Sequence, residues 1–589
     1  MGGDAECVAA AREIAVSNTA TVETPHSETL RAPGARAAWR NPALLCLAGA
    51  VACSGTLILI LESHLTFLAD DWDFLLHRRG SSLGVFLDPH ADHIAIAPVA
   101  IYKLLLATFG MDSALPFQVI STSVFLLAAV LLFVYLRPRV GDWPALLATS
   151  LILFLGAGWN DLLWPFQIGF SAPIAAGLGA LLALDRDDRL GDLIAYALLV
   201  VASSFSEVGI PFVAGALVKL VVNGERSAKR LSVALVPFAF YAAWWLGWGH
   251  TAPSSFSLHN VLVSPTYVFD AVSQAMASLF GLATPLSGRG WQPVGLNSGR
   301  LLLVIAIGLA IWRLRSLGGV PRGLWIALAM GGTFWFLTAF NANAVLRPPT
   351  NGRLVYPSAV FVVLIATEFL RGARLGRRAL ATAAAVTAAA VISGVWFLHL
   401  GYGILDSLSK GARSRLAAIE IARETVNPTL ALRSFITPIQ AGPYLSAVDA
   451  FGSPAYSEQE LASSSERVRQ GVDNTLAIAL GIKLEPAARA STASSSVRGS
   501  GRGCRTEEAS PAGQPGLELR PGEFTLRDRS APGAVVQLAR FSDDPSVSLG
   551  SLQPGRVVSL EIPPDRSTRL WRVGFRGTGR ITLCDVGPG

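Results

Sequence analysis

The first residues in this sequence that could do chemistry are acids, in the run Ala69-Asp70-Asp71-Trp72-Asp73-Phe74. Three carboxylates within four residues repel one another unless a cation, a proton or a cationic partner compensates. Of Asp70 and Asp71, one could deprotonate an acceptor hydroxyl while the other binds an amine or a divalent cation, Mg²⁺ or Mn²⁺. The alternative is a solvated loop with no further role. We take Asp70 and Asp71 as candidate catalytic residues, Asp71 also as the candidate metal ligand, and Asp73 as a supporting acid.

A second polar group follows in the run Asp88-Pro89-His90-Ala91-Asp92-His93. His90 and His93 are three residues apart and would share one face of a helix, with Asp92 beside them. A histidine is a readily titrated donor that could hold a leaving phosphate or orient a carboxylate. The spacing is weak support for a metal site, and histidines that touch water and lipid headgroups are the alternative.

Two arginines, Arg347 and Arg353, lie in a segment that runs through Tyr356 into an apolar stretch. An arginine at a membrane boundary is costly unless it is paired or solvated, and its planar fork suits a phosphate or a carboxylate. Ordinary snorkelling to lipid headgroups is the alternative. Glu207, an acid between two apolar segments, is expected either to cap a helix or to pair with Arg353.

These groups are set in a very apolar chain. Of its 589 residues, 51% are hydrophobic and only 15% are charged. A mean hydropathy of +0.46 excludes a soluble enzyme of this length. We predict a polytopic α-helical membrane protein with about eleven spans, each of roughly 20 residues. The expected spans are 43–62, 115–136, 143–159, 168–184, 192–206, 208–222, 231–249, 299–316, 323–340, 354–370 and 379–400.

Basic residues set the expected orientation, because short cytoplasmic loops carry an excess of Lys and Arg. An eleven-span chain with a cytoplasmic N-terminus puts all the later basic clusters inside. If His93–Phe109 were a further span, every later loop would change sides and the basic clusters would lie outside. This segment and 265–285 are therefore expected to lie on the outer membrane surface, with Lys103 snorkelling. Positive-inside arginines account for most of the net charge of +7, so it predicts no nucleic-acid partner. Abundant Arg and Ala suit a bacterial plasma membrane.

The C-terminal third changes character. Short alternating runs separated by Pro-Gly, Asp-Pro and Gly-Thr-Gly turns predict a small all-β domain, a sandwich. Cys504 and Cys584 lie near its two ends, and in an oxidising exterior they could form a disulfide. The expected parts are a disordered cytoplasmic tail (1–40), a membrane domain (41–400), an extracytoplasmic helical region (401–488), a flexible linker (489–503) and the β domain (504–589).

The order of these landmarks resembles the GT-C superfamily of membrane glycosyltransferases, which includes protein O-mannosyltransferases and the enzymes that transfer aminoarabinose or arabinose. Asp70-Asp71 matches the acidic motif of the first external loop in that family. The surface helix that follows is matched from His93 to Thr108-Phe109-Gly110. Arg353-Leu354-Val355-Tyr356-Pro357 is similar to an Arg-Tyr-x-x-Pro motif with the tyrosine displaced. Ser206-Glu207-Val208-Gly209 is similar to a Lys-Glu-x-Gly motif with serine in place of lysine.

The resemblance covers roughly residues 43–400 and implies a polyprenyl-phosphate sugar donor. It implies that Asp70 is the general base on the acceptor hydroxyl and that Asp71 assists it or holds a cation. Arg353 would neutralise the leaving phosphate, and the sugar would be transferred with inversion. Arg347, His90 and His93 would contribute to the phosphate site. The acceptor would be a cell-envelope glycan, a lipid or a protein.

Two other functions fit the same sequence. A transporter or flippase for a lipid-linked envelope precursor would use the acids and arginines to bind cargo. Transporters tend to carry internal repeats and charges near the membrane midplane, whereas this chain has no convincing repeat and its charges cluster at predicted outer ends. A catalytically inactive scaffold whose β domain binds wall polymer is the third function.

Overall fold

The structure is a computed structural model that describes residues 41–285, 293–294, 296–317, 319–343, 347–432, 438–486, 503–528 and 533–586. The expected tail, 1–40, lies outside the described residues, as does all of the expected linker except residue 503. The chain divides into two units, Met1–Cys46 and Leu47–Gly589. The candidate site and the β domain both belong to the second unit.

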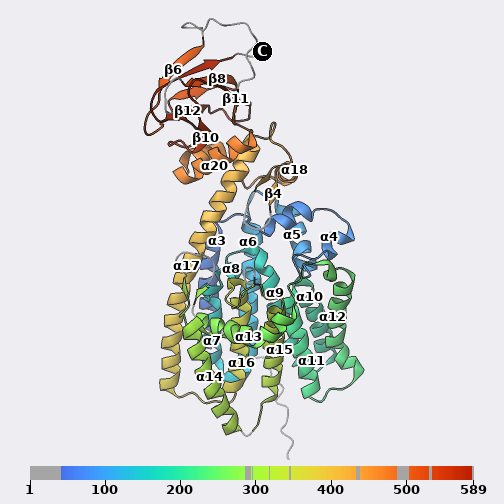
Figure 1. The fold of residues 1–589 in the computed structure, drawn as a ribbon. Coiled ribbons are helices and arrows are strands. Elements are labelled where there is room, and N and C mark those ends of the chain that lie inside the picture. The colour runs from blue at the N-terminus through green and yellow to red at the C-terminus, as the bar shows by residue number, and fades with distance from the viewer. Residues whose placement is uncertain are drawn as a thin grey trace, which may run out of the picture. The chain divides into compact units, whose positions relative to one another are not determined.

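Helices make up most of the chain before the C-terminal strands (Figure 1). Among the described residues, eight stretches are long and apolar enough to cross a membrane. They are α3 (Pro42–Glu62), α6 (Leu115–Val140), α7 with α8 (Asp142–Leu162), η3 with α9 (Pro165–Leu184), α12 (Ala228–Gly247), α15 (Arg322–Phe340), α16 (Gly352–Leu370) and α17 (Arg377–Ile421).

The three other expected spans correspond to helices of a different kind. α10 (Arg189–Phe205) and α11 (Ile210–Val222) have 17 and 13 residues, fewer than the roughly 20 that cross a bilayer without help. α14 (Leu296–Leu317) has 22 residues but carries three arginines. The expectation of eleven spans is therefore supported for eight of them.

The segment expected to lie on the membrane surface contains the helix α5 (Ile96–Phe109), which buries Val99, Tyr102 and Leu105 on one side. The Lys103 side chain, expected to snorkel, is bound by backbone carbonyls. Its ammonium group donates to the carbonyls of Arg79 at 3.0 Å and Gly80 at 2.6 Å. The loop before α5 has backbone acceptors that no strand or helix satisfies, and the lysine ammonium group satisfies two of them. The second expected surface helix, 265–285, overlaps α13 (Leu258–Leu279), which begins earlier, at an N-cap hydroxyl of Ser257, and ends at Leu279.

Close backbone contact brings α17 against the break between α7 and α8. The 3₁₀ turn η2 (Gly156–Gly158) lies there, and a Cβ on Gly156 would come within 1.7 Å of the Gly394 carbonyl oxygen. Only glycine permits this approach. α17 also continues unbroken past the expected boundary at residue 400 to Ile421. The extension contains no proline, and the Lys410–Asp406 pair at 2.7 Å supports it one turn apart.

The region after α17 contains three shorter helices, α18 (Ala441–Phe451), α19 (Glu458–Ser463) and α20 (Glu466–Ala479). Antiparallel strands then form two sheets (Figure 1). One sheet has the order β10-β9-β12-β7 and the other β5-β11-β8-β13-β6. The bounds are β5 (Leu484–Pro486), β6 (Cys504–Glu508), β7 (Leu517–Leu519), β8 (Gly522–Asp528), β9 (Val535–Ala539), β10 (Val547–Ser551), β11 (Val557–Ile562), β12 (Trp571–Arg576) and β13 (Arg580–Asp585).

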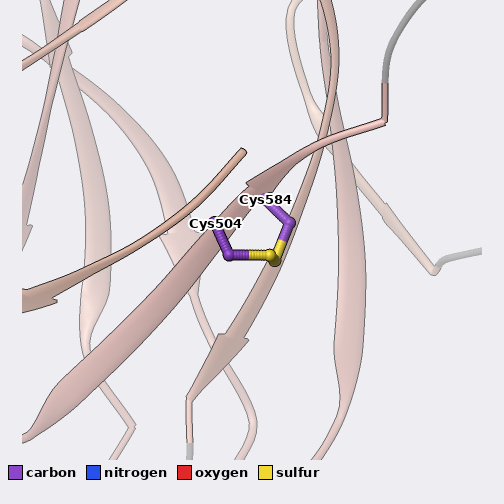
Figure 2. The surroundings of a disulfide bond; sticks show 2 residues. All are labelled: Cys504 and Cys584. Carbon is purple, nitrogen blue, oxygen red and sulfur yellow. A yellow bond between two sulfur atoms is a disulfide. The ribbon is translucent and has the colours of Figure 1, made fainter. Parts of the chain in front are cut away.

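Alternate residues of these strands are buried, for example Phe524 and Leu526 on β8, as in a two-sheet sandwich. β5 joins the sheet from before the expected linker, because it pairs with β11. Cys504 and Cys584 face each other across β6 and β13 with 4.0 Å between their α-carbons, and a disulfide joins them (Figure 2). This is the pair that the sequence suggested.

Asp473 and Asp565 are two buried acids that, together with Arg540, hold the β domain in place. We call these three residues the junction clamp. The Asp473 carboxylate on α20 accepts the backbone N–H groups of Arg540, Phe541 and Ser542 at 2.9 to 3.0 Å. The Arg540 side chain makes a bidentate pair with Asp565, and the side chains of both are at most 4% exposed. Arg540 also donates to the Arg569 carbonyl at 2.9 Å. Every group of the clamp therefore has fixed partners.

Candidate active site

The acidic run folds into a buried turn at the end of α3. Trp72 is fully buried, donates its indole N–H to the Phe67 carbonyl at 3.1 Å, and packs edge-on against Phe67 and Tyr444. Ala69, immediately before the acids, has a φ of 40°, a conformation that costs free energy outside glycine and is found where the surroundings impose it. Asp70 is 7% exposed and Asp71 is 0% exposed. The solvated-loop alternative is therefore wrong for these two residues.

Asp71 is surrounded by uncharged donors. Its carboxylate accepts the Leu68 N–H at 2.8 Å, the Tyr102 hydroxyl at 2.5 Å and the Trp164 indole N–H at 2.9 Å. Burial raises the pKa of Asp71 to about 7, and these hydrogen bonds only partly oppose the shift. Because both oxygens are already occupied by donors, Asp71 is poorly arranged to bind a cation.

Asp70, in contrast, faces cations. Its Oδ2 lies 3.5 Å from Nη1 of Arg353 and 4.0 Å from Nε2 of His90. Burial by itself would raise the pKa of Asp70, but the interaction with His90 and the charge of Arg353 outweigh burial and hold that pKa below its usual range. Asp70 is thus an ionised carboxylate at neutral pH.

His90 joins Asp70 to Asp73. Its Nδ1 lies 3.1 Å from Oδ2 of Asp73, which also accepts from Nε of Arg78 at 3.2 Å. Burial opposes ionisation of Asp73, yet His90 and Arg78 lower its pKa to about 2. Burial likewise lowers the pKa of His90, and the two carboxylates more than reverse this, so the pKa is raised overall. We call Asp70, Asp71, Asp73, His90 and Arg353 the active-site cluster.

The two histidines do not share a helical face. His90 and His93 exchange backbone hydrogen bonds of 3.0 and 3.1 Å across a tight turn, with Ala91 at a φ of 53°. α5 begins only at Ile96. Pro89 disfavours a helix through the preceding residue, and the left-handed Ala91 interrupts any helix there. The expectation of one helical face is wrong, although the rings still lie 5.6 Å apart.

A second ionic group contains the other predicted residues. Arg347 contacts the carboxylate of Asp92 and lies 3.8 Å from that of Glu207. His93 lies 3.4 Å from Asp92 and 3.6 Å from Glu207. Burial disfavours the charged form of Arg347, but the two acids raise its pKa above the usual range. Burial raises the pKa of Asp92, and the charges of His93 and Arg347 lower it overall.

Both expectations for Glu207 are therefore wrong in their details. It pairs with Arg347 and His93 rather than with Arg353. The N-cap of η4 (Glu207–Gly209) is Ser206, whose hydroxyl accepts the Val208 N–H and donates to the Gly169 carbonyl at 2.6 Å. A serine hydroxyl accepts this helical N–H at an N-cap without a charge.

Arg353 lies in the first turn of α16, where the Asn351 side chain caps its N–H at 3.0 Å. Its guanidinium group lies 5.8 Å from the centre of the Trp164 ring. Among the described residues its side chain makes no hydrogen bond, and it is 28% exposed. Tyr356, one turn further along α16, is buried against Phe125 with ring centroids 5.6 Å apart. Tyr356 is thus a core residue beside the cluster.

The sequence analysis missed four residues that shape this site. Tyr102 and Trp164 hold Asp71, and Arg78 holds Asp73. Asp161 on α8 (Trp159–Leu162) is 4% exposed and close enough to Arg353 to interact with its charge. An acid between Trp159 and Trp164 in an otherwise apolar run was a signal for Asp161. Trp164 itself is buried, so its indole N–H serves Asp71 rather than solvent.

Among the described residues no group of three or more His, Cys, Asp or Glu side chains is arranged to hold a metal ion. In this geometry Asp71 is satisfied by neutral donors and Asp70 by cations, so the cluster does not fit a Mg²⁺ or Mn²⁺ site.

No family model matches the sequence, and a comparison with curated proteins found no similar one. The function must therefore be inferred from the arrangement of the residues.

Proposed function

We propose that this protein is an inverting membrane glycosyltransferase that moves a sugar from a polyprenyl-phosphate donor to a hydroxyl of a cell-envelope glycan, lipid or protein. We further propose that the active-site cluster faces the outside of a bacterial plasma membrane. One observation carries the proposal: Arg353, whose side chain keeps its hydrogen-bond donors unused within the described chain, lies 3.5 Å from the ionised Asp70. A phosphate-binding cation and a base are thereby adjacent.

Arg353 is a better phosphate ligand than Arg347. Arg347 is already engaged by two carboxylates, Asp92 and Glu207, so a phosphate would have to displace both. Among the described residues Arg353 has one ion pair, and its side chain is more exposed than that of Arg347, 28% against 21%. A phosphate that binds Arg353 with two hydrogen bonds would therefore replace only the 3.5 Å contact with Asp70. Arg347, with His93, Asp92 and Glu207, is assigned to shaping the wall of the site.

The proposed reaction couples the two residues. When the donor phosphate binds Arg353, it neutralises one of the positive charges that lower the pKa of Asp70. Asp70 then becomes a stronger base. The acceptor oxygen then attacks the anomeric carbon from the face opposite the phosphate, and its proton passes to Asp70. The bond between the anomeric carbon and the phosphate oxygen breaks, and Arg353 stabilises the charge on the leaving phosphate. Attack from the opposite face inverts the anomeric centre.

The other cluster residues have positioning roles. His90 bridges Asp70 and Asp73 and so fixes the orientation of the base. Asp71 has a pKa of about 7, which would suit a general base, but it is completely buried and cannot reach an acceptor. It instead anchors the turn through Tyr102 and Trp164. No step is assigned to a divalent cation.

The test compares two acids of the same loop in full-length protein reconstituted in nanodiscs. Polyprenyl-phosphate mannose and arabinose carrying a radiolabelled sugar serve as donors. Asp70→Asn should lower the transfer rate about 10²- to 10⁴-fold, because it removes the proton acceptor with little change of shape. Asp88→Asn is the matched control, since Asp88 is exposed, and it should keep the wild-type rate.

Full activity in Asp70→Asn would refute the assignment. Movement of a fluorescent polyprenyl phosphate across vesicle membranes, without sugar transfer by the wild type, would favour the flippase. Absence of both activities, with wall polymer bound by the full-length protein, would favour the scaffold.

A further inference from the structure

A separate polar cavity lies where α3 ends, α6 begins and α17 passes. Its volume is about 390 Å³, within the range of roughly 300–1,000 Å³ usual for small-molecule sites. None of the residues of the active-site cluster lines it. The cavity instead includes Leu65 and Thr66, and the Thr66 N–H donates to the Ser409 hydroxyl of α17 at 3.2 Å. This contact fixes one wall of the cavity to the helix.

α17 supplies a polar stripe to the cavity. Tyr402, Asp406, Lys410 and Arg413 all line it, and their spacing of four, four and three residues places them on one helical face. This stripe lies in the part of α17 that continues beyond the expected end of the last span. Three other segments of the chain form the remaining walls of this cavity. The polar face of α17 therefore lines a site and does more than contact bulk solvent.

Three of the four charged side chains that line the cavity form ion pairs within the protein. Lys410 pairs with Asp406 at 2.7 Å. Arg413 pairs with Glu460 at 2.9 Å and donates to the Pro454 carbonyl at 2.9 Å, with its guanidinium group 3.9 Å from the Tyr456 ring centre. The fourth charge, Asp112, accepts the Ser453 N–H at 2.7 Å. An ionic ligand would have to break these pairs, whereas a neutral ligand would not.

Two lining groups retain hydrogen-bonding capacity. In the part of the chain that the structure describes, neither the Tyr402 hydroxyl nor the His64 ring has a hydrogen-bond partner. The paired Asp406 and Lys410 keep further acceptor and donor positions, because a carboxylate and an ammonium group each form several hydrogen bonds. Tyr402 also presents an aromatic ring. Donors, acceptors and an aromatic face without net charge match the hydroxyl groups and the apolar face of a sugar ring.

We propose that this cavity binds a neutral saccharide unit. The inference does not depend on the proposed transferase activity, since no residue of the active-site cluster takes part. Two variants probe it, Tyr402→Ala, which removes the ring, and Asp406→Asn, which removes a charged acceptor. Asp449→Asn is the control: Asp449 is an exposed acid on α18 that pairs with Arg423 and does not line the cavity.

The experiment is saturation-transfer NMR on the full-length protein in phosphatidylcholine nanodiscs. The probes are maltotriose, mannotriose and arabinotriose, with glycerol 3-phosphate as an anionic comparison. At least one trisaccharide should receive saturation from the wild type, and each cavity variant should weaken its binding about tenfold through the lost contact. Asp449→Asn should bind as the wild type does.

Three results would overturn the proposal. Saturation of none of the trisaccharides would exclude a neutral saccharide site. Saturation of glycerol 3-phosphate alone would identify an anion site, such as one for a lipid headgroup. Trisaccharide binding unchanged in both cavity variants would place the saccharide site elsewhere, for example in the β domain. Because the assay measures binding only, an inactive transferase would leave its outcome unaffected.

Discussion

The junction clamp and the active-site cluster both bury acids beside an arginine, but they satisfy these groups differently. In the clamp, Arg540 holds Asp565 with two hydrogen bonds and also donates to backbone carbonyls. In the cluster, Arg353 lies 3.5 Å from Asp70 and makes no side-chain hydrogen bond among the described residues. Each guanidinium nitrogen of Arg540 already donates a hydrogen bond, whereas those of Arg353 donate none among the described residues.

This difference separates charges that maintain architecture from charges available for chemistry. A buried ion pair with every donor satisfied gains little from a ligand, and breaking it is costly. A partly exposed pair with poor geometry contributes little to stability, so it can exchange its partner at low cost. The two arginines differ in exposure, 28% for the Arg353 side chain against 4% for that of Arg540, and also in the hydrogen-bond donors that they leave unused.

The largest expected effect is on the clamp. Arg540→Ala should lower the free energy of opening of β9 and β12 by about 3–5 kcal/mol, because Asp565 would stay buried without its cation. Hydrogen exchange followed by mass spectrometry on the full-length protein measures this. Arg580→Ala is the control, since Arg580 and Glu508 form an exposed pair on the same domain and should contribute little. An equal loss of free energy of opening in Arg540→Ala and Arg580→Ala would show that the junction clamp is no more important for stability than an exposed ion pair.

The disulfide gives the next largest effect. Replacing Cys504 and Cys584 together by serine should reduce the free energy of opening of β6 and β13 by about 2–4 kcal/mol, because the bond closes a loop with a sequence separation of 80 residues. Faster hydrogen exchange confined to the β domain is the expected readout. Exchange that is the same in the variant and the wild type would mean that the strands hold their pairing without the covalent link.

Arg353→Ala tests whether the arginine of the active-site cluster serves donor binding rather than stability. It should weaken binding of the polyprenyl-phosphate donor about 10- to 100-fold, as expected for lost charge-assisted hydrogen bonds. The melting temperature should hardly change, because Arg353 is partly exposed and loosely paired. Calorimetry with the donor and thermal unfolding of the same sample report both quantities. A large loss of stability with unchanged donor affinity would make Arg353 an architectural residue like Arg540.

The smallest expected effect, counted per pH unit, is the pH dependence of the free energy of unfolding. Burial raises the pKa of Asp71 to about 7 in the folded protein, so the folded state holds this proton more tightly than the unfolded chain, where the pKa is near 3.8. Stability from Asp71 therefore increases as the pH falls from about 7 towards 4, by about 1 kcal/mol per pH unit or less. Asp71→Asn should remove this dependence.

The comparison of melting temperatures at pH 5 and pH 7.5 checks it. His90 also favours the folded state at lower pH, because its folded pKa is raised, but it is present in both proteins and cancels in their difference. An identical pH dependence in the wild type and Asp71→Asn would show that Asp71 is ionised throughout this range.

The sequence indicated much of this arrangement through local composition. The apolar helices, the alternating strands and the pair Cys504–Cys584 were readable because each depends on residues close in sequence or on a simple count. Asp70, His90 and Arg353 were selected as polar groups in apolar surroundings. Their selection needed no knowledge of distances.

Other features depended on contacts between distant segments. The pairing of Glu207 with Arg347, the bond from Lys103 to the Gly80 carbonyl and the bond from Trp164 to Asp71 each join segments that are far apart in the sequence. No periodicity encodes such pairings. Among the described residues, fewer helices than expected are long and apolar enough to span a membrane. α10 and α11, joined by the short turn η4, are each too short to cross a bilayer alone, and α14 carries three arginines.

By itself, then, the sequence determined which segments are apolar enough to leave water and which charged residues must find partners there, because transfer free energies depend on residue type. Only the tertiary structure decided which partner each charge received. Asp71 became a buried acid with neutral donors and Asp70 its ionised neighbour, although they are adjacent and chemically identical. Burial, the donors around each carboxylate and the position of Arg353 made that difference, and all three exist only after the helices have packed.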